Sequence, residues 1–524
     1  MAQQQQYLAG IDVGTTGTRC SIFDLTGTRV ASEYLEYPST YPHPGWVEQD
    51  IRFMIERCME ACRKSIEAAG VAPEAIASIG FSTQRSVTCP VDAGGQPVRD
   101  MISWQDARTG AEVEDMRQLI SDEEYYALSG LPMGTTWIIA KILWMRKNEP
   151  ELFAKTAKVV QNQDIVLRAF GADGFCTDLS CMPFYGVWDV RNATWNRKLM
   201  ELFDVTPELF GTPTPPGTQV GVIGAEIAER TGFAVGTPIC VGAGDQNCSV
   251  VGMGAIKPGM ATVTLGTAGL AILAVDQPVP GFGGMMITHH AVPGQWEVEG
   301  LSNAAASSFR WFRDVVGKSE LKQACDSNSD AYQLLTQLAE QSTPGARGIL
   351  YMPYLATAGT PRWNPEARSA FIGLSLAHNR ADLVRSVMEG VVLEIRDMVE
   401  EWQRQEMQID VLRLGGGATK SALWNQIQAD IYGRPVQTLR ESDTTVLGAA
   451  ILGGVGAGVF NSIAEGVGSM VHVTGELEPD AQAHAIYEDL YQAYRSAYEG
   501  LTQSGTYHRL ATLQQRLSSL DRKM

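Results

Sequence analysis

Two short glycine–threonine segments of this sequence have the composition of phosphate-binding turns. One lies within "YLAGIDVGTTGTRCSIFD" at residues 7–24, and the other is "LGTAG" at residues 265–269. Glycine lets an anion approach the backbone N–H groups of a hairpin tip closely. In the first turn, Thr15 and Thr16 add hydroxyl donors and Arg19 adds a cation. Each segment therefore predicts a cradle for phosphate, and an ordinary β-turn is the alternative for each.

Two aspartates lie where they could act on that phosphate. Asp12 ends the strand that precedes the first turn, where a carboxylate can hold Mg²⁺ and the Mg²⁺ can hold phosphate oxygens. Asp245, in "VGAGDQNCSVVG", follows a strand and a glycine bend, directly before a predicted helix. A carboxylate there can take the proton of a hydroxyl that attacks phosphorus. The structural alternative is that Asp245 caps a helix that starts near Asn247.

A third glycine cluster, "LGGGATKSALWNQ", predicts a strand, a turn and a helix that begins near Ser421. The glycines would let a flat group lie against the backbone, and the helix would present free N–H groups. This suits an adenosine, and a tight strand–helix joint is the alternative. The sequence has no GxxxxGK[ST] motif and no early GxGxxG motif, which excludes a P-loop protein and disfavours dinucleotide binding.

The elements that would position these residues form a mixed α/β pattern. Residues 7–13, 18–24 and 29–37 read as three successive strands, followed by a helix over 50–70 and a strand over 76–83. The same strand, Gly-Thr turn and strand recur after residue 258, which indicates an internal repeat. We therefore expect two domains, residues 1–255 and 256–490. The tail should be helical from about Asp480 on, pack on the second domain and carry no chemistry, and residues 491–524 should form a helical C-terminal extension.

Composition limits the partners. The chain has 524 residues, a formal net charge of −18 and a pI of about 4.9. This acidity argues against nucleic acid or an anionic membrane as the main partner. Its nine cysteines include no CxxC pair and its seven histidines no HExxH motif. We find no signal peptide and no apolar run long enough to span a bilayer. These observations predict a cytoplasmic protein.

The order of these motifs resembles that of the FGGY family of carbohydrate kinases, which includes xylulokinases, glycerol kinases and gluconate kinases. The resemblance runs from about residue 7 to about residue 490. It includes "PHPGWVEQD" at 42–50 and the long pattern "SAFIGLSLAHNRADLVRSVMEG" at 369–390. The N-terminal signature is looser, because Ile138 stands where a small residue is usual. The resemblance implies an α/β fold of two actin-like (ribonuclease-H-like) domains with a catalytic cleft between them.

The resemblance also implies a role for each motif. Asp245 matches the catalytic base, and Asp12 lies near Mg²⁺, with ATP as the phosphoryl donor. Arg310 and Ala306 stand where glycerol kinases carry Gln and Gly, which alters the nucleotide contacts without removing them. The residues implied to bind ATP are Gly14, Thr15, Thr16, Arg19, Gly266, Thr267, Arg310, Gly416, Gly417, Ala418 and Ser421.

The segment implied to bind the substrate hydroxyls matches no well-known subgroup of the FGGY family. "FSTQRSVTCPVD" keeps the arginine of the glycerol kinases but has Ser86 where they have glutamate, and it lacks the Met-His of the xylulokinases. Trp137 occupies part of the place of an aromatic pair of the glycerol kinases. The residues expected to bind the substrate are Gln84, Arg85, Ser86, Trp104, Asp106, Trp137, Asp245 and Gln246.

These residues are compatible with several functions. We expect phosphorylation of a small sugar or polyol by a xylulokinase-like enzyme, and glycerol or an autoinducer-2 precursor is the alternative acceptor. Outside this class, a non-catalytic actin-like ATPase or sensor would use ATP for domain motion alone. A homodimer is a further expectation, since dimers are common among relatives.

Overall fold

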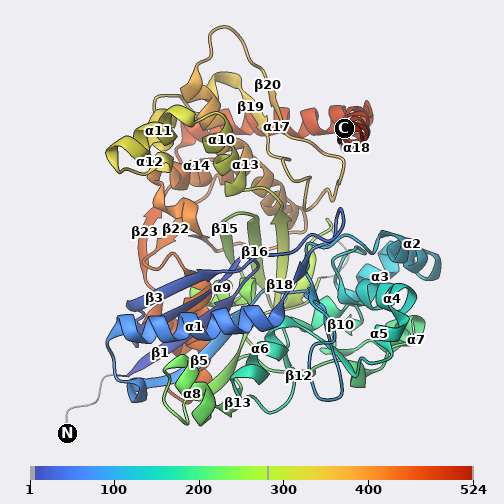
Figure 1. Cartoon of the computed structure of the whole chain (residues 1–524). Coiled ribbons are helices and arrows are strands. Elements are labelled where there is room, and N and C mark those ends of the chain that lie inside the picture. The colour runs from blue at the N-terminus through green and yellow to red at the C-terminus, as the bar shows by residue number, and fades with distance from the viewer. Residues whose placement is uncertain (1–5, 280–282, 522–524) are drawn as a thin grey trace.

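The computed structural model describes residues 6–279 and 283–521, and two sheets form its framework. Most of the first half of the chain forms the lower lobe in Figure 1, and most of the second half forms the upper lobe. The first sheet has the order β13-β14-β5-β1-β2-β3 and the second β17-β18-β16-β15-β21-β22-β23. The first contains β1 (Tyr7–Val13), β2 (Gly17–Asp24), β3 (Arg29–Glu36), β5 (Ile76–Thr83), β13 (Gln219–Val222) and β14 (Pro238–Gly244). The second contains β15 (Met260–Leu265), β16 (Gly269–Val275), β17 (Met286–His289), β18 (Trp296–Ser302), β21 (Val411–Gly415), β22 (Val436–Leu439) and β23 (Val473–Leu477).

The two sheets share one topology. In the first, the antiparallel strands β3, β2 and β1 are followed by β5 and β14, both parallel to β1. In the second, β18, β16 and β15 are antiparallel, and β21 and β22 continue in parallel. Each Gly-Thr turn joins the first two strands of its repeat. The repeat predicted from the sequence is therefore confirmed, and so is the α/β fold of two actin-like domains.

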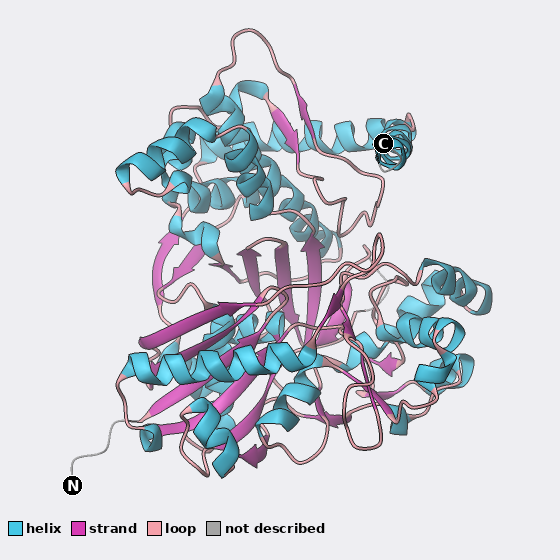
Figure 2. Ribbon diagram, viewed as in Figure 1, coloured by secondary structure: helices cyan, strands magenta, loops and turns pink. Residues whose placement is uncertain are grey.

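Helices cover the sheets and fill the lobes (Figure 2). The helix α1 (Ile51–Ala69) begins where the Asp50 side chain accepts hydrogen bonds from two backbone N–H groups, and it ends at Gly70 with φ 63°. Two further helices of the first half, α6 (Asn162–Phe170) and α8 (Ala225–Thr231), pack near α1. A group of shorter helices extends the first half to one side of its sheet: α2 (Gly110–Leu119), α3 (Asp122–Ser129), α4 (Ile138–Asn148), α5 (Pro150–Phe153) and α7 (Arg197–Phe203). The upper lobe contains α10 (Ala306–Val315), α11 (Lys318–Ser327), α12 (Ala331–Ala339), α13 (Arg380–Arg404), α14 (Ala422–Tyr432), α17 (Ala481–Gln503) and α18 (Thr506–Asp521).

One helix of the second half packs on the sheet of the first half. The helix α15 (Thr444–Gly456) shares a buried core with Leu8 and Phe23, whereas α16 (Ile463–Met470) lies beside α15. α15 also crosses α9 (Asp245–Gly252) at van der Waals distance. At this crossing a Cβ on Gly448 would lie 1.8 Å from the carbonyl oxygen of Cys248. Only glycine allows two helix backbones to approach so closely.

The element boundaries follow the sequence prediction with two differences. The helix after β14 begins at Asp245 and not near Asn247. The helical tail begins at Ala481, close to the predicted start at Asp480, but the predicted boundary at residue 490 falls inside the continuous helix α17. Within the described residues, no helix combines the length and apolar character that a membrane span needs.

Candidate active site

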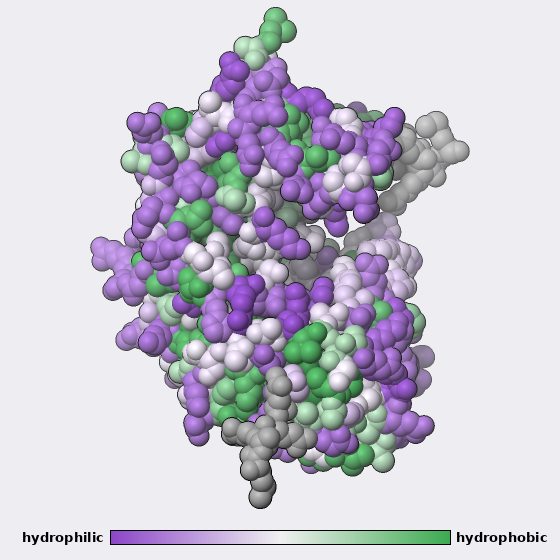
Figure 3. Space-filling model, turned by 90° about the vertical axis from the view of Figure 1, so that its left-hand side faces the viewer, coloured by the Kyte–Doolittle hydropathy of each residue, from purple (hydrophilic) through white to green (hydrophobic). Residues whose placement is uncertain are grey.

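A pocket of about 550 Å³ lies between the two halves of the chain. Its walls come from the first half through Arg85, Trp137 and Asp245, and from the second half through Glu299 and Trp363. The space-filling view shows a hollow in the surface at mid-height, between the two lobes (Figure 3). Of the predicted substrate residues, the structure brings Arg85, Ser86, Trp104, Asp106, Trp137, Asp245 and Gln246 together around this pocket.

Asp245 is the first residue of α9, and its carboxylate has few hydrogen-bond partners. One oxygen accepts a hydrogen bond from the Gln246 backbone N–H at 2.8 Å and lies 3.3 Å from Nε of Arg85. Its side chain keeps 28% of its surface exposed, toward the pocket that it lines. Burial raises the pKa of Asp245, Arg85 opposes that rise, and Glu299 adds to it. A carboxylate of raised pKa with a free oxygen is suited to accept a proton.

Arg85 is held by a carboxylate from the other half of the chain. Its two terminal nitrogens donate to the two carboxylate oxygens of Glu299, on β18, at 2.8 and 2.6 Å. The guanidinium also lies 4.8 Å from the ring centre of Phe184. Burial opposes the Arg85 charge, but the Glu299 carboxylate outweighs it and the pKa of Arg85 is raised. Arg85 therefore lines the pocket as a charged group whose charge is balanced by Glu299.

A second buried carboxyl lies behind this pair. Glu297 precedes Glu299 by two residues and shares its face of β18, because side chains on one face repeat every second residue. It accepts a hydrogen bond from Asn247 Nδ2 at 2.8 Å, and Asn247 Oδ1 lies 3.3 Å from Arg85 NH1. Burial, together with the charge of Glu299, raises the pKa of Glu297 well above its usual range. Burial thus favours the neutral form of Glu297 behind the charged pair of Arg85 and Glu299.

Three of the predicted substrate residues are fixed by protein contacts. Ser86, at φ 58°, donates from Oγ to the Thr136 carbonyl at 2.7 Å. Trp137 Nε1 donates to the Pro132 carbonyl at 2.5 Å, so its ring is held as a wall. Gln84 is buried, and its Nε2 donates to Gln49 at 2.9 Å. Gln84 does not line the pocket, and its Oε1 has no partner.

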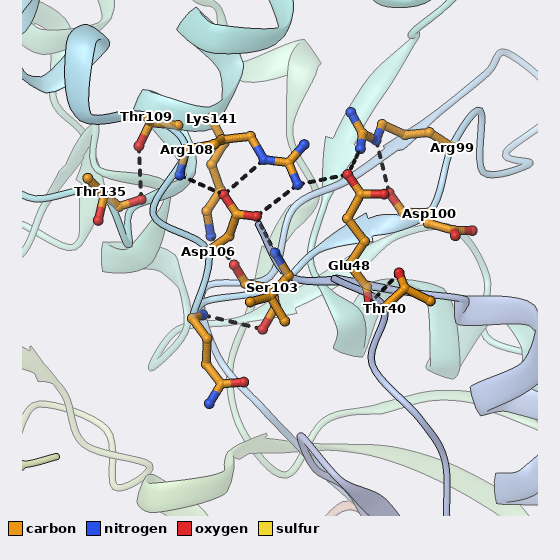
Figure 4. A network of polar contacts seen from close by, with 12 residues as sticks. Thr40, Glu48, Arg99, Asp100, Ser103, Asp106, Arg108, Thr109, Thr135 and Lys141 are labelled. Carbon is orange, nitrogen blue, oxygen red and sulfur yellow. Dashed lines mark hydrogen bonds and ion pairs between the residues drawn. The ribbon is translucent and has the colours of Figure 1, made fainter. Parts of the chain in front are cut away.

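Asp106 lines the pocket, yet protein groups occupy both of its oxygens. Arg108 donates to them through Nε at 2.9 Å and NH2 at 2.8 Å, and the Val47 backbone N–H donates at 2.6 Å (Figure 4). Arg108 also bonds Glu48 at 2.7 Å. The structure therefore shows Asp106 as an organiser of the surrounding loop, and its predicted contact with substrate stays a prediction.

A larger pocket of about 740 Å³ opens in the second half of the chain. It is lined by the turn after β15 and by the glycine cluster after β21. Gly416 has φ 82°, and a Cβ there would lie 2.6 Å from the Leu265 carbonyl oxygen, so this close crossing needs glycine. Ser421 caps α14 by accepting from the Trp424 N–H at 3.1 Å. The predicted nucleotide residues that line the pocket are Gly266, Thr267, Arg310, Gly417, Ala418 and Ser421.

The turn at residues 266–268 lies between the two pockets. Gly266 and Thr267 line the larger pocket, and Ala268 lines the smaller one. A ligand in the larger pocket can therefore extend past this turn toward Asp245.

The first Gly-Thr turn lines neither pocket but contacts their surroundings. Trp104, a wall of the smaller pocket, donates from Nε1 to Thr15 Oγ1 at 3.0 Å. Thr16 Oγ1 lies 3.2 Å from the Tyr34 hydroxyl. Gly14 N–H donates to the Gly17 carbonyl at 3.0 Å and closes the turn. Arg19 pairs with Asp443 of the second half at 2.7 Å.

Asp12 ends β1 beside this turn, and its carboxylate accepts a hydrogen bond from Ser82 at 2.8 Å. Burial, with Asp245 as the second cause, raises the pKa of Asp12 to about 7. A half-buried carboxylate near other carboxylates is electrostatically unfavourable when it is ionised, and a bound divalent cation would offset that cost. Among the described residues, no three His, Cys, Asp or Glu side chains form a metal cluster, so phosphate and water oxygens would complete such a site.

Two family models match the chain. The N-terminal domain of the FGGY family of carbohydrate kinases matches residues 7–252, and its C-terminal domain matches residues 261–457. The chain belongs to the FGGY family of carbohydrate kinases. It is therefore a phosphotransferase with an alcohol group as acceptor.

Individual FGGY relatives differ in their substrates. A gluconokinase of Bacillus licheniformis is 26% identical over 98% of this chain and 99% of its own length. An autoinducer-2 kinase of Salmonella paratyphi A is 29% identical over 94% of each chain. The crystal structure of a xylulose kinase from Rhodospirillum rubrum is 26% identical, with a TM-score of 0.85 over 96% of this chain and 100% of that one. Membership in the FGGY family thus leaves the acceptor open.

The sequence analysis of this FGGY kinase missed Glu299, Phe184 and Trp363, which all line the smaller pocket. A signal for Glu299 was present, because "WEVEGLS" places two acids on one face of a strand that is otherwise largely apolar. Nothing local marked Trp363 or Phe184, whose place depends on distant packing.

Proposed function

We propose that this protein phosphorylates a hydroxyl of a small, uncharged sugar or polyol with ATP. A xylulose-like ketose is the first choice of acceptor, and glycerol or an autoinducer-2 precursor is the alternative. The observation that carries the proposal is the position of Asp245. It faces a polar and aromatic pocket that meets the nucleotide-sized pocket at the turn of residues 266–268.

The charges around the smaller pocket support an uncharged acceptor. Among the described residues that line it, Arg85 is the one cationic side chain, and Glu299 already neutralises it. Asp245 adds a further negative charge. An anionic acceptor such as gluconate would therefore find no free cation and would be repelled by two carboxylates. Hydroxyl groups can instead donate to Asp245 and accept from Arg85.

The proposed reaction is a direct transfer. Asp245 takes the proton of the acceptor hydroxyl, the hydroxyl oxygen forms a bond to the γ-phosphorus, and the bond from that phosphorus to the β,γ-bridging oxygen breaks. ADP leaves with the bond's electron pair. The raised pKa of Asp245 makes it a stronger base than an ordinary aspartate. Gly266 and Thr267 line the pocket through which the phosphates would pass, and the Gly266 N–H closes the turn on the Ala268 carbonyl at 3.0 Å.

Asp12 and the first turn would hold Mg²⁺ and the phosphates, together with Thr15, Thr16 and Arg19. A bound Mg²⁺ would supply charge neutralisation of the transferred phosphoryl group. For Arg19 to contact phosphate, it would exchange its partner Asp443 for the nucleotide. Asp12 must be ionised to bind a cation, so we expect nucleotide affinity to weaken as the pH falls through about 7.

The test measures ADP release with xylulose, glycerol, erythritol, an autoinducer-2 precursor and gluconate as separate acceptors. We expect release that depends on an uncharged acceptor, no release with gluconate, and loss of release in Asp245→Asn with ATP binding retained. Release without any acceptor would favour an actin-like ATPase or sensor. Turnover by Asp245→Asn like that of the wild type would refute the assignment of the base.

A further inference from the structure

The segment of residues 353–364, which we call the wall loop, forms one side of the smaller pocket. It follows β19 (Leu350–Met352) and contributes Ala356, Thr357 and Trp363 to the pocket wall. Thr357 has φ 98° and Trp363 has φ 42°, conformations that residues other than glycine rarely adopt. Such strained residues persist only where their surroundings hold them.

Both strained residues have hydrogen bonds that direct them to the pocket. Asn303, another pocket residue, donates from Nδ2 to Thr357 Oγ1 at 3.1 Å. Trp363 Nε1 donates to the Gly284 carbonyl at 2.6 Å. Because its one polar atom is engaged, Trp363 can offer the pocket only the apolar surface of its ring. That surface suits the carbon chain of a sugar or polyol.

The residue next to Trp363, Arg362, does not line the pocket, and its side chain is largely buried against α13 and α17. Arg362 donates to the Tyr354 hydroxyl at 2.5 Å and pairs with Asp397 of α13. Its guanidinium lies 3.8 Å from the ring centre of Tyr498 and 4.9 Å from that of Tyr494, both on α17. Cation–π attraction is strongest for a largely desolvated cation, so these two rings hold the Arg362 side chain in place and serve as its anchor.

The anchor is built by one face of α17. Tyr487, Tyr491, Tyr494 and Tyr498 follow the i, i+4, i+7, i+11 spacing that places residues on a single helical face. Tyr491 donates to Asp397 at 2.7 Å, and the Tyr494 and Tyr354 hydroxyls lie 2.5 Å apart. The tail that the sequence predicts to be without chemistry therefore contacts Arg362, which is adjacent in the chain to the pocket residue Trp363.

A second bond ties the end of the wall loop to the same helix. Asn364 donates from Nδ2 to the Tyr498 hydroxyl at 3.0 Å. Asn364 and Ala358 also exchange backbone hydrogen bonds of 3.1 and 3.2 Å, which close the loop on itself. Tyr498 thus contacts residues on both sides of Trp363.

We propose that the C-terminal helix α17 positions the acceptor pocket, by holding Arg362 and so fixing Trp363 and Thr357 against the acceptor. Trp363 is then a specificity-determining residue, and Arg362, Tyr494 and Tyr498 are positioning residues. This inference rests on the proposed function for the identity of the acceptor, but not for the coupling between α17 and the wall loop.

The test compares three variants on the same face of α17. Tyr498→Leu removes the ring over Arg362, and Tyr498→Phe keeps that ring while losing only the hydroxyl. Tyr487→Phe is the matched control, because it removes a buried hydroxyl that bonds Arg385 and Glu389, away from the wall loop. Hydrogen exchange of residues 353–364 is measured for each full-length protein, together with KM for ATP and for the acceptor that the wild type uses.

For Tyr498→Leu we expect exchange in the wall loop to rise about tenfold and the acceptor KM to rise about tenfold, with the KM for ATP within about twofold. Tyr487→Phe should keep the wild-type acceptor KM. Tyr498→Phe keeps the ring over Arg362 but loses the bond from Asn364, so it should raise the acceptor KM by less than Tyr498→Leu does. Unchanged exchange in Tyr498→Leu, or an equal rise in both KM values, would overturn the inference. If no sugar or polyol supports ADP release by the wild type, the proposed function fails, whereas the exchange experiment still decides the coupling.

Discussion

The pair of Arg85 and Glu299 offers the sharpest test of how the acceptor pocket is built. Replacing Glu299 by glutamine keeps the size of the side chain and one acceptor oxygen but removes its charge. Arg85 then loses one of its two short bonds, at 2.8 and 2.6 Å, and its remaining carboxylate neighbour is Asp245. The substitution therefore changes both stability and the basicity of Asp245.

The magnitude follows from the burial of the pair. Removing one partner of a buried ion pair costs roughly 3–5 kcal/mol. Glutamine retains one hydrogen bond and Asp245 compensates in part, so we expect a loss of about 2 kcal/mol. For a chain of this size that corresponds to a fall of roughly 2 °C in the thermal midpoint.

The effect on catalysis has a definite sign. Arg85 lowers the pKa of Asp245 and Glu299 raises it, so Glu299→Gln lowers that pKa on both counts. The base must be ionised to act, and the acid limb of the kcat–pH profile should therefore move to lower pH, by about one unit. At neutral pH kcat should fall, because a weaker base takes the proton less readily.

The matched control is Glu297→Gln. Glu297 shares the strand face and the burial of Glu299, but it bonds Asn247 and not Arg85. Burial raises the pKa of Glu297 well above its usual range, which favours the neutral carboxyl, and glutamine has nearly the same shape without a charge. We expect the control to keep the wild-type acid limb. The reasoning is refuted if Glu299→Gln leaves the acid limb in place, or if Glu297→Gln moves it equally.

Three further predictions concern Asp12, the helix crossing and α16. Asp12→Asn should abolish phosphoryl transfer yet stabilise the ligand-free protein at pH 8 by on the order of 1–3 kcal/mol, because a carboxyl with a pKa of about 7 is ionised there at a cost to the fold. That gain should vanish below about pH 4, where the unfolded chain is protonated too, and thermal unfolding at the two pH values measures it. Gly448→Ala should destabilise the protein by more than about 3 kcal/mol, since its Cβ would meet the Cys248 carbonyl at 1.8 Å. Gly468→Ala on α16, where a Cβ meets nothing within 4 Å, should instead stabilise by about 0.5–1 kcal/mol, and urea unfolding of both variants compares them.

The parts of the fold that the sequence predicted are those that depend on near neighbours. The β1–β2 hairpin alternates apolar residues about a glycine turn, and α1 carries its own cap at Asp50 and its stop at Gly70. The place of Asp245, between a buried strand and a helix, is local as well. Pattern and turn chemistry decide such elements, so one sequence suffices to find them.

The parts that escaped prediction depend on distant partners. Arg85 finds Glu299 at a separation of 214 residues, and the spacing of neither residue indicates the other. Arg362 lies among the aromatic rings of a helix that begins more than a hundred residues later. Asp106 resembles a ligand by motif, but the packing of Arg108 against it gives its oxygens other partners.

The packing of α15 on the first sheet has a consequence for how the protein is made. Leu8, Phe23 and the face around them are covered by Val446, Leu447 and their neighbours. A ribosome that adds roughly 5–20 residues per second completes α15 about 20 to 90 seconds after the first strand. Throughout that interval the first half has an apolar face with no cover. The two-lobed enzyme therefore completes its first core only when synthesis is nearly over, and chaperones that bind exposed apolar strands have that interval in which to act.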